Sequence, residues 1–352
     1  MVKYAYMEPK PTKGTLIISL DFELMWGMFD KVTHEQYGAN LDGVHTVIPK
    51  LLALFAERNI HATWATVGML MYQDAHELAS TLPSAEDEPN YLNPRLSVYH
   101  HLKTDAVMEY PIHYFAPTLI EHIMATPNQE LGSHTFSHYY CAEEQTVGHE
   151  KSTAFFVADS RAFTTTLRRL GRTATSIVFP RNQWTNTALY TLADTGFTAF
   201  RGTENHFLYR VRTDNEQQNP FIRLMRLADH YLNLSGHHTY PLAPNLIHGS
   251  GLVNLPASRF LRPWNRRLFW LESLRLRRIK DSLTYAAKHG EAFHLWWHPH
   301  NFGTNQTENL TVLVTLLEHF AYLQKTYQME SLTMSEAARR VLEWPEPNAS
   351  VT

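Results

Sequence analysis

The sequence predicts an α/β fold in which parallel strands curl into a closed or nearly closed barrel. Short apolar runs alternate with longer segments of helical period along most of the 352 residues, which is typical of a parallel sheet with crossover helices. The first apolar run ends at Asp21 and Glu23, and a late run ends at His298. Reactive groups at the carboxyl ends of both strands suit a barrel whose active site lies at that end.

Six short runs are predicted as strands, and three longer segments are predicted as helices. The predicted strands are 16–20, 60–67, 130–133, 176–179, 197–200 and 293–297, and the predicted helices are 44–58, 151–170 and 186–195. The last two helices stop just before Gly171 and Gly196, as helices commonly do at glycine. Residues 1–352 are expected to form one catalytic domain with proline-rich or irregular insertions at about 73–116 and 204–265.

Composition excludes several classes of protein. The formal net charge of −3 gives no reason to expect a nucleic-acid partner. The single cysteine, Cys141, excludes an internal disulfide framework. Because neither a signal sequence nor a long apolar span is evident, we expect a soluble, cytoplasmic protein without a transmembrane segment. The oligomeric state is not indicated.

The segment His134-Thr-Phe-Ser-His138 predicts a metal site, because two histidines four residues apart can face the same way on one helical turn. It lacks the glutamate of the H-E-x-x-H motif, so a general base must come from elsewhere. The alternative is a coincidental spacing in a chain with 21 histidines.

Asp21 and Glu23 can complete this site, because alternation along a strand places both on one face. Catalytic metal sites usually have three protein ligands, so one carboxylate can bind the metal while the other accepts a proton from water. The alternative is that both residues cap a helix or close a turn. The apolar continuation Leu-Met-Trp-Gly-Met-Phe argues against a solvated turn, since buried carboxylates are costly unless paired or metal-bound.

Two further residues are candidates for proton transfer and for orientation of the site. His298 can protonate a leaving group because histidine titrates near neutral pH, and His300 competes for this role. Arg181 follows the fourth predicted strand and can hold Asp21 ionised as a bidentate partner. The alternatives are a packed or surface histidine and a surface arginine.

Taken together, these motifs resemble the polysaccharide deacetylase family, the NodB-homology or carbohydrate esterase family 4 group, in a branch with Asp-x-Glu in its first motif. The matching segments are Ser19-Leu-Asp21-Phe-Glu23, Ile60–Val67, His134-Thr-Phe-Ser-His138, Phe179-Pro-Arg181-Asn and Leu295-Trp-Trp-His298. These segments lie within residues 15–303, which is most of the chain.

The resemblance implies a distorted (β/α)7 barrel of the glycoside hydrolase/deacetylase type. It also implies a divalent metal held by Glu23, His134 and His138, with Asp21 as the base and His298 as the acid. The reaction would remove an N- or O-linked acetyl group from a sugar or polysaccharide precursor. Zn²⁺ is the default metal because imidazole and carboxylate suit it, with Fe, Co or Ni as alternatives.

The chain departs from the family pattern in three places. The usual Asp-Asp pair is replaced by Asp21 and Glu23, so these two residues can exchange roles. Pro180 precedes Arg181 instead of following it. The acidic residue that would tune the late histidine is not evident, and Glu204 is only a candidate.

Two other features could contact a substrate. Four tryptophans near the motifs could stack on sugar rings, although each could equally belong to the core: Trp26, Trp184, Trp296 and Trp297. The basic stretch 262–280 could bind a phosphate-bearing lipid- or nucleotide-linked sugar or an acidic glycan, or could be a solvated helix face.

Two rival functions remain. An amidohydrolase acting on a ureide or formamide would use the same metal site, and a carbohydrate-binding protein would have lost catalysis. The exact sugar is not indicated by the sequence.

Overall fold

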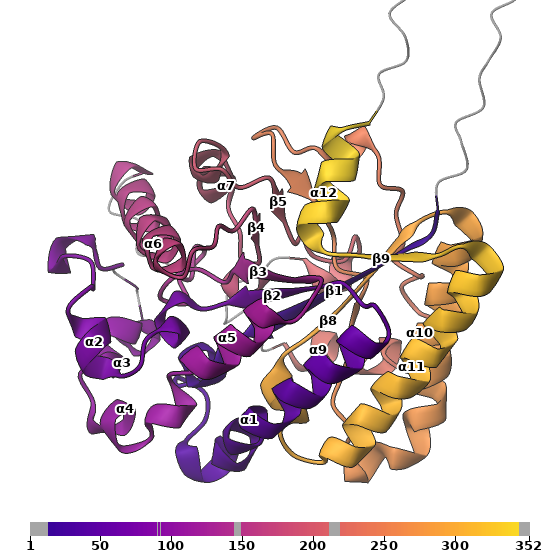
Figure 1. The fold of residues 1–352 in the computed structure, drawn as a ribbon, viewed down its shortest axis with the longest axis horizontal. Coiled ribbons are helices and arrows are strands. Elements are labelled where there is room, and N and C mark those ends of the chain that lie inside the picture. The colour runs from indigo at the N-terminus through magenta and orange to yellow at the C-terminus, as the bar shows by residue number, and fades with distance from the viewer. Residues whose placement is uncertain (1–12, 90, 92, 144–148, 211–218, 345–352) are drawn as a thin grey trace, which may run out of the picture.

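The computed structural model describes residues 13–89, 91, 93–143, 149–210 and 219–344. Within these residues, nine strands form one sheet, which is curled into a half-barrel and surrounded by helices (Figure 1). The strands are β1 Thr15–Phe22, β2 Ala62–Thr66, β3 Gln129–Ser133, β4 Ser176–Ile177, β5 Ala199–Phe200, β6 Val253–Asn254, β7 Arg259–Phe260, β8 Ala292–Trp297 and β9 Glu330–Leu332. The predicted α/β barrel class is therefore confirmed.

The strand order is β6-β5-β4-β3-β2-β1-β8-β7, with β9 pairing to β1 outside this path. All of these strand pairs are parallel, and β1 lies at the centre with β2, β8 and β9 as neighbours. The six predicted strands correspond to β1–β5 and β8. The remaining three, β6, β7 and β9, have two or three residues each and were not predicted.

The two edges of the sheet are joined by residues 255–258, which run directly from β6 to β7. On one side Leu255 N–H donates to Phe200 O, which lies in β5. On the other side Ser258 N–H donates to His294 O, which lies in β8. This segment therefore bridges the gap between the edges, although no ladder forms between β6 and β7.

The helices of the described residues are α1 His34–Glu57, α2 Ala75–Ala79, α3 Val98–Leu102, α4 Asp105–Glu109, α5 Pro117–Ala125, α6 His149–Arg169, α7 Asn186–Ala193, α9 Pro220–Asp229, α10 Glu272–His289, α11 Gln306–Tyr327 and α12 Met334–Leu342. Helix α1 begins ten residues before its predicted start. A capping box explains this start, because Thr33 Oγ1 accepts from Gln36 N–H while the Gln36 side chain accepts from Thr33 N–H. Among the described residues, each helix is too short or too polar to cross a bilayer.

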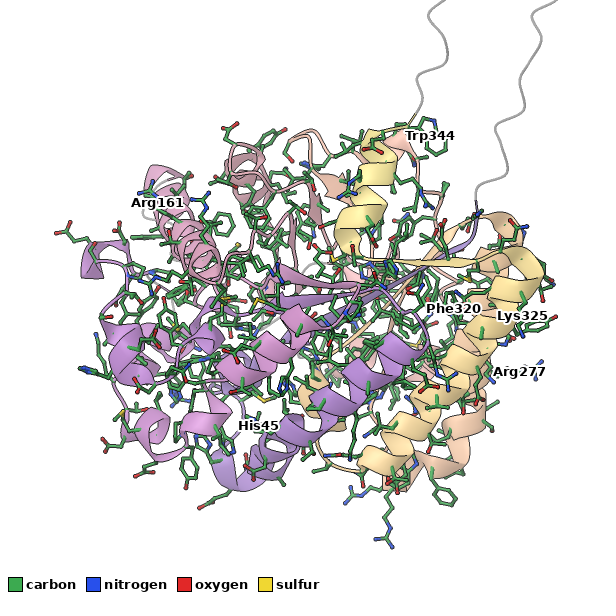
Figure 2. The ribbon with its side chains drawn as sticks, in the orientation of Figure 1. His45, Arg161, Arg277, Phe320, Lys325 and Trp344 are labelled. Atoms are coloured by element: carbon green, nitrogen blue, oxygen red, sulfur yellow. The ribbon has the colours of Figure 1, made fainter. Side chains whose placement is uncertain are left out.

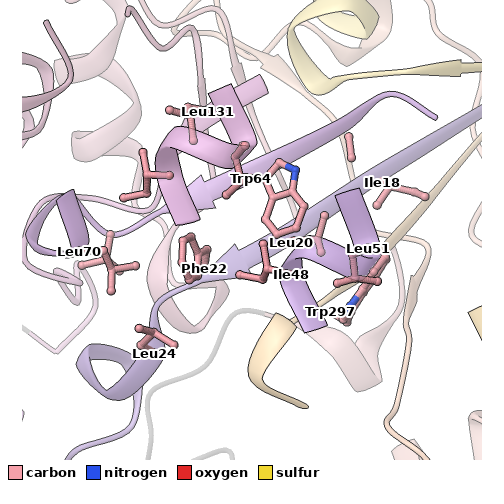
Figure 3. Packing of buried hydrophobic residues seen from close by; sticks show 14 of the residues in the cluster. Ile18, Leu20, Phe22, Leu24, Ile48, Leu51, Trp64, Leu70, Leu131 and Trp297 are labelled. Atoms are coloured by element: carbon pink, nitrogen blue, oxygen red, sulfur yellow. The ribbon is translucent and has the colours of Figure 1, made fainter. Parts of the chain in front are cut away.

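The core lies between α1 and the sheet. Ile48 and Leu51 of α1 pack beside Leu20, Trp64 and Trp297 from three adjacent strands (Figure 3). Each of these side chains is buried, and burial of one such side chain contributes about 1.5–3 kcal/mol. The three charged side chains labelled in Figure 2, those of Arg161, Arg277 and Lys325, lie at the periphery.

Helix α1 also packs against the loop after β8 so closely that their backbones are in contact. This loop contains the 3₁₀ turn η10, Pro299–Phe302. A Cβ on Gly43 would lie 2.0 Å from Gly303 O, and a Cβ on Gly303 would lie 1.8 Å from Asn40 O. Asn40 Nδ2 donates to His300 O at 3.0 Å. Two glycines are therefore required where the late histidines are attached to α1.

Candidate metal and catalytic site

A cleft of about 430 Å³ opens at the carboxyl end of the sheet, where active sites of α/β barrels lie. Its lining includes Asp21, Glu23, His138, Trp296 and His298. These residues come from β1, β8 and the loop after β3, which are neighbouring parts of the sheet. Segments that are far apart in sequence are thus brought to one wall.

Glu23, His134 and His138 converge at the bottom of this cleft. Glu23 Oε2 lies 3.1 Å from His134 Nε2 and 3.0 Å from His138 Nε2. One donor atom from each residue lies within 4.8 Å of the others, and all three residues are buried. Imidazole nitrogens and a carboxylate oxygen are a donor set that suits Zn²⁺ and related divalent ions.

Hydrogen bonds at the opposite ring nitrogens support this use of the histidines. His134 Nδ1 lies 2.8 Å from Val178 O, which can only accept, so Nδ1 carries a proton and Nε2 is the ring atom that faces Glu23. His138 Nδ1 lies 2.9 Å from the Tyr140 hydroxyl. Burial lowers the pKa of His138 to about 4 despite the adjacent Glu23. Both rings are therefore suited to bind a cation, and the three residues fit the metal that the resemblance implies.

The histidine segment is not helical, so the expected helical turn is wrong. Thr135 and His138 have φ of 62° and 54°, in the left-handed region, and the segment forms a tight loop after β3. Asp159 of α6 holds the loop, because its carboxylate accepts from the Phe136 and Ser137 N–H groups at 2.7 and 3.0 Å. Burial raises the pKa of Asp159 to about 6, against these hydrogen bonds. The two rings are therefore positioned by a loop that the buried Asp159 carboxyl holds in place, and not by a helix.

Asp21 is paired with Arg201, so the prediction that Arg181 is its partner is wrong. Both Asp21 oxygens lie 2.7 Å from the Arg201 guanidinium in a bidentate pair. The guanidinium also donates to Ser19 Oγ and stacks 4.2 Å from the Trp296 ring centroid. Burial alone would raise the pKa of Asp21, but Arg201 lowers it below its usual value. The sequence signal for Arg201 was its position directly after the predicted strand 197–200.

Arg181 lies at the cleft but engages a different acid. Its Nη2 donates to Asp30 Oδ2, and its guanidinium lies 4.3 Å from the centroid of the Tyr140 ring. Because Tyr140 contacts His138, Arg181 is connected to the histidine loop and not to Asp21. Any contribution of Arg181 to catalysis must therefore act through substrate contact or through this loop.

His298 faces the two carboxylates. Its Nε2 lies 3.5 Å from Glu23 Oε1 and 3.8 Å from Asp21 Oδ2. Its Nδ1 lies 3.4 Å from Asn301 Nδ2, and Tyr37 of α1 donates to Asn301 Oδ1 at 3.0 Å. An amide therefore occupies the place where an acidic residue was sought, and Glu204 lies elsewhere on the cleft wall.

His300 stacks on His298, with ring centroids 5.0 Å apart. It is buried, and burial lowers its pKa to about 3. His298 is the more accessible of the two rings, since its side chain is 23% exposed. Geometry therefore favours His298 over His300 for contact with a substrate.

The Glu23 carboxylate is kept ionised by the histidines around it. Burial would raise the pKa of Glu23, but His298, His134 and His138 hold it well below its usual range.

The four tryptophans near the motifs differ in their surroundings. Trp26 and Trp297 are buried in the core and Trp184 is partly buried against it. Trp296 lines the cleft and is the tryptophan placed for substrate contact.

Comparison with known proteins agrees with this geometry. The family model for polysaccharide deacetylases matches residues 28–200, which include the histidine loop and Arg181. Over these residues the chain is similar to polysaccharide deacetylases. Asp21, Glu23 and His298 lie outside the matched range, so their assignment to the site depends on the contacts described above. No curated protein sequence matches the chain.

Solved structures share the fold of this chain at low sequence identity. A polysaccharide deacetylase-type protein from Mycobacterium smegmatis has a TM-score of 0.58 at 13% identity, covering 97% of this chain and 94% of its own. A similar protein from Pseudomonas aeruginosa PAO1 has a TM-score of 0.50 at 12% identity, covering 93% and 90%. A 4-alpha-glucanotransferase from Thermococcus litoralis has a TM-score of 0.51 at 12% identity, covering 93% and 40%. At these identities the similarity extends to the fold alone.

Proposed function

We propose that the chain is a metal-dependent hydrolase that removes an N- or O-linked acetyl group from a sugar or polysaccharide precursor. The observation that carries this proposal is the position of Glu23 Oε2, at 3.1 and 3.0 Å from the Nε2 atoms of His134 and His138, beside a second carboxylate that Arg201 keeps ionised. The match of residues 28–200 to the polysaccharide deacetylase family model supports the reaction class.

Glu23, His134 and His138 would hold the metal, with Zn²⁺ as the first candidate and Fe, Co or Ni as alternatives. A bound cation would supply Lewis acidity toward the acetyl carbonyl and toward water. This assignment gives Glu23 the ligand role, because both oxygens of Asp21 are already engaged by Arg201. The exchange of roles that the sequence left open is therefore disfavoured.

Asp21 would act as the general base, accepting the proton of the attacking water, while Arg201 fixes the orientation of its carboxylate. His298 would donate a proton from Nε2 to the leaving nitrogen or oxygen, since this atom faces the same space as both carboxylates. Asn301 contacts the ring at Nδ1, and Tyr37 in turn donates to Asn301. Trp296 would pack against a sugar ring.

Acetate release from N-acetylated and O-acetylated sugar oligomers, measured with and without chelator, tests the proposal. We expect release that chelation removes and added divalent metal restores. Undiminished release after complete chelation would contradict metal dependence. Sugar binding without acetate release under all metals would favour the carbohydrate-binding alternative, and release of ammonia or formate from small amides would favour the amidohydrolase.

A further inference from the structure

The basic stretch 262–280 contains an exposed aromatic pair that the proposed function does not use. Phe269 and Trp270 in the 3₁₀ turn η9, Arg266–Leu271, are 63% and 64% exposed. Leu274, in the first turn of α10, is 40% exposed. Three large apolar side chains within six residues are therefore presented to solvent, which is unusual for a soluble surface.

The arginines of this stretch divide into two groups. Arg275 and Arg278 are buried, and they bond within the protein to Arg262 O and Gly236 O respectively. Arg266 and Arg267 are exposed directly beside the aromatic pair. Arg277 is 79% exposed, extends away from α10 (Figure 2), and lies 3.7 Å from Asp281. The exposed face therefore combines aromatic and cationic side chains.

This positive charge is local. Residues 262–280 contain seven arginines and lysines and one acidic residue, whereas the whole chain has a formal net charge of −3. The acidic residue, Glu272, is paired with buried Arg275. Because Arg275 and Arg278 are buried and bonded within the protein, the exposed positive charge beside the aromatic pair is that of Arg266 and Arg267, and it favours an anionic partner.

The topology places this face at the same end of the barrel as the cleft. Phe260 of β7 pairs with Trp296 of β8, and both line the cleft. The chain leaves the carboxyl end of β7, forms η9, and returns along α10 toward the start of β8. Since β7 and β8 are parallel, η9 and the first turn of α10 lie at the carboxyl end of the sheet.

We propose that Phe269, Trp270 and Leu274, with Arg266 and Arg267, form a docking face for an anionic lipid bilayer. Aromatic and leucine side chains enter the interfacial region of a membrane, while flanking arginines attract anionic headgroups. A second copy of the chain would fit this face less well, because a twofold contact would oppose its arginines. Docking here would bring the cleft toward the membrane surface.

Sedimentation of the full-length protein with lipid vesicles tests this proposal without reference to catalysis. We expect binding to vesicles of equal parts phosphatidylcholine and phosphatidylglycerol, weaker binding as salt increases, and little binding to phosphatidylcholine alone. The double variant Phe269→Ser/Trp270→Ser should lower partitioning at least about tenfold. The double variant Arg266→Gln/Arg267→Gln should lower it about fivefold for each arginine.

The matched control is Tyr322→Ser on α11, which removes a comparably exposed aromatic ring, 56% exposed, outside this face. It should bind anionic vesicles as the unmodified protein does. All variants should retain the unfolding midpoint, because the replaced side chains are exposed. Absence of vesicle binding by the unmodified protein, or equal binding by the aromatic double variant, would overturn the proposal. So would self-association or oligosaccharide binding that depends on Phe269 and Trp270 without any binding to anionic vesicles.

Discussion

Within the described residues, the histidines at the cleft and those between α1 and residues 101–114 form clusters that differ in how their ring nitrogens are used. In the cleft, two Nε2 atoms converge on one carboxylate oxygen of Glu23. In the second cluster, between α1 and residues 101–114, His34 Nδ1 faces His113 Nδ1 at 2.9 Å, and His34 and His101 both contact the Tyr114 hydroxyl. The second cluster thus directs its nitrogens at one another and at a phenol.

The two clusters show that a metal site depends on convergence and not on the number of histidines. Asp42, the acid of the second cluster, contacts His113 at Nε2, on the far side of the ring from His34, and its side chain is 60% exposed. Within the described residues, converging donor atoms are found for Glu23, His134 and His138. We therefore expect the clusters to respond differently to the same kinds of substitution.

The largest difference is expected when one histidine is removed from each cluster. His138→Ala should lose bound metal and at least about 10³-fold in turnover, because Lewis acidity contributes several kcal/mol to the barrier. His113→Ala should keep its metal. Elemental analysis after dialysis, together with acetate release, measures both effects. Full metal content in His138→Ala and in His134→Ala would remove these residues from the ligand set.

The charged pairs beside the two clusters, Asp21–Arg201 and Asp42–His113, should differ next in their contribution to stability. Arg201→Met leaves the Asp21 carboxylate buried without its bidentate partner, which costs about 3–5 kcal/mol of stability. Asp42→Asn alters an exposed pair and should cost about 1 kcal/mol or less. Urea unfolding curves compare the two variants. Equal losses would mean that the Asp21–Arg201 pair contributes no more than a surface contact.

Removal of the tyrosine hydroxyl that contacts each cluster should have a smaller effect, which is seen in metal affinity. Tyr140→Phe removes the group that contacts His138 Nδ1 and should weaken metal affinity about 10- to 100-fold. Tyr114→Phe, which removes the partner of His34 and His101, should leave metal affinity unchanged. Competition with a coloured chelator measures both affinities. An equal effect of both substitutions would argue that Tyr140 has no specific role in orienting His138.

The smallest effect is expected in the pH dependence of stability. Burial, together with the neighbouring His34, lowers the pKa of His101 to about 4, whereas histidine in an unfolded chain has a pKa of about 6.5. Protonation therefore favours the unfolded state, so this contribution is complete above about pH 6.5 and is lost as the pH falls toward 4. His101→Asn should lose less stability than the unmodified protein between these values. Parallel unfolding midpoints across this range would contradict the shift.

Much of the site could be predicted from sequence because its residues follow strands. Asp21, Glu23 and His298 follow or end long, buried, apolar strands whose position is strongly specified. Parallel strands bring their carboxyl ends to one edge, so convergence of these groups followed from the fold class. The strands β6 and β7 were not predicted, because no apolar run marks them in the sequence as runs 176–179 and 197–200 mark β4 and β5, and they are defined by pairing with β5 and β8.

The partner of Asp21 could not be chosen from sequence in the same way. Arg181 and Arg201 both follow predicted strands, and the reach of each depends on which strand lies opposite β1 across the half-barrel. Arg201 is held over Asp21 by Trp296 and Ser19, contacts that sequence spacing does not encode. Likewise, the loop of His134 and His138 is set by Asp159, which lies 21 residues further along the chain than His138.

The glycine pair at Gly43 and Gly303 has a consequence for comparing this chain with its relatives. Neither position can accept a methyl group while α1 and the loop after β8 keep their separation. A relative that carries larger residues at both positions must move that loop outward, and with it the ring of His298. The residues found at these two positions can therefore show which relatives share this chain's arrangement of His298.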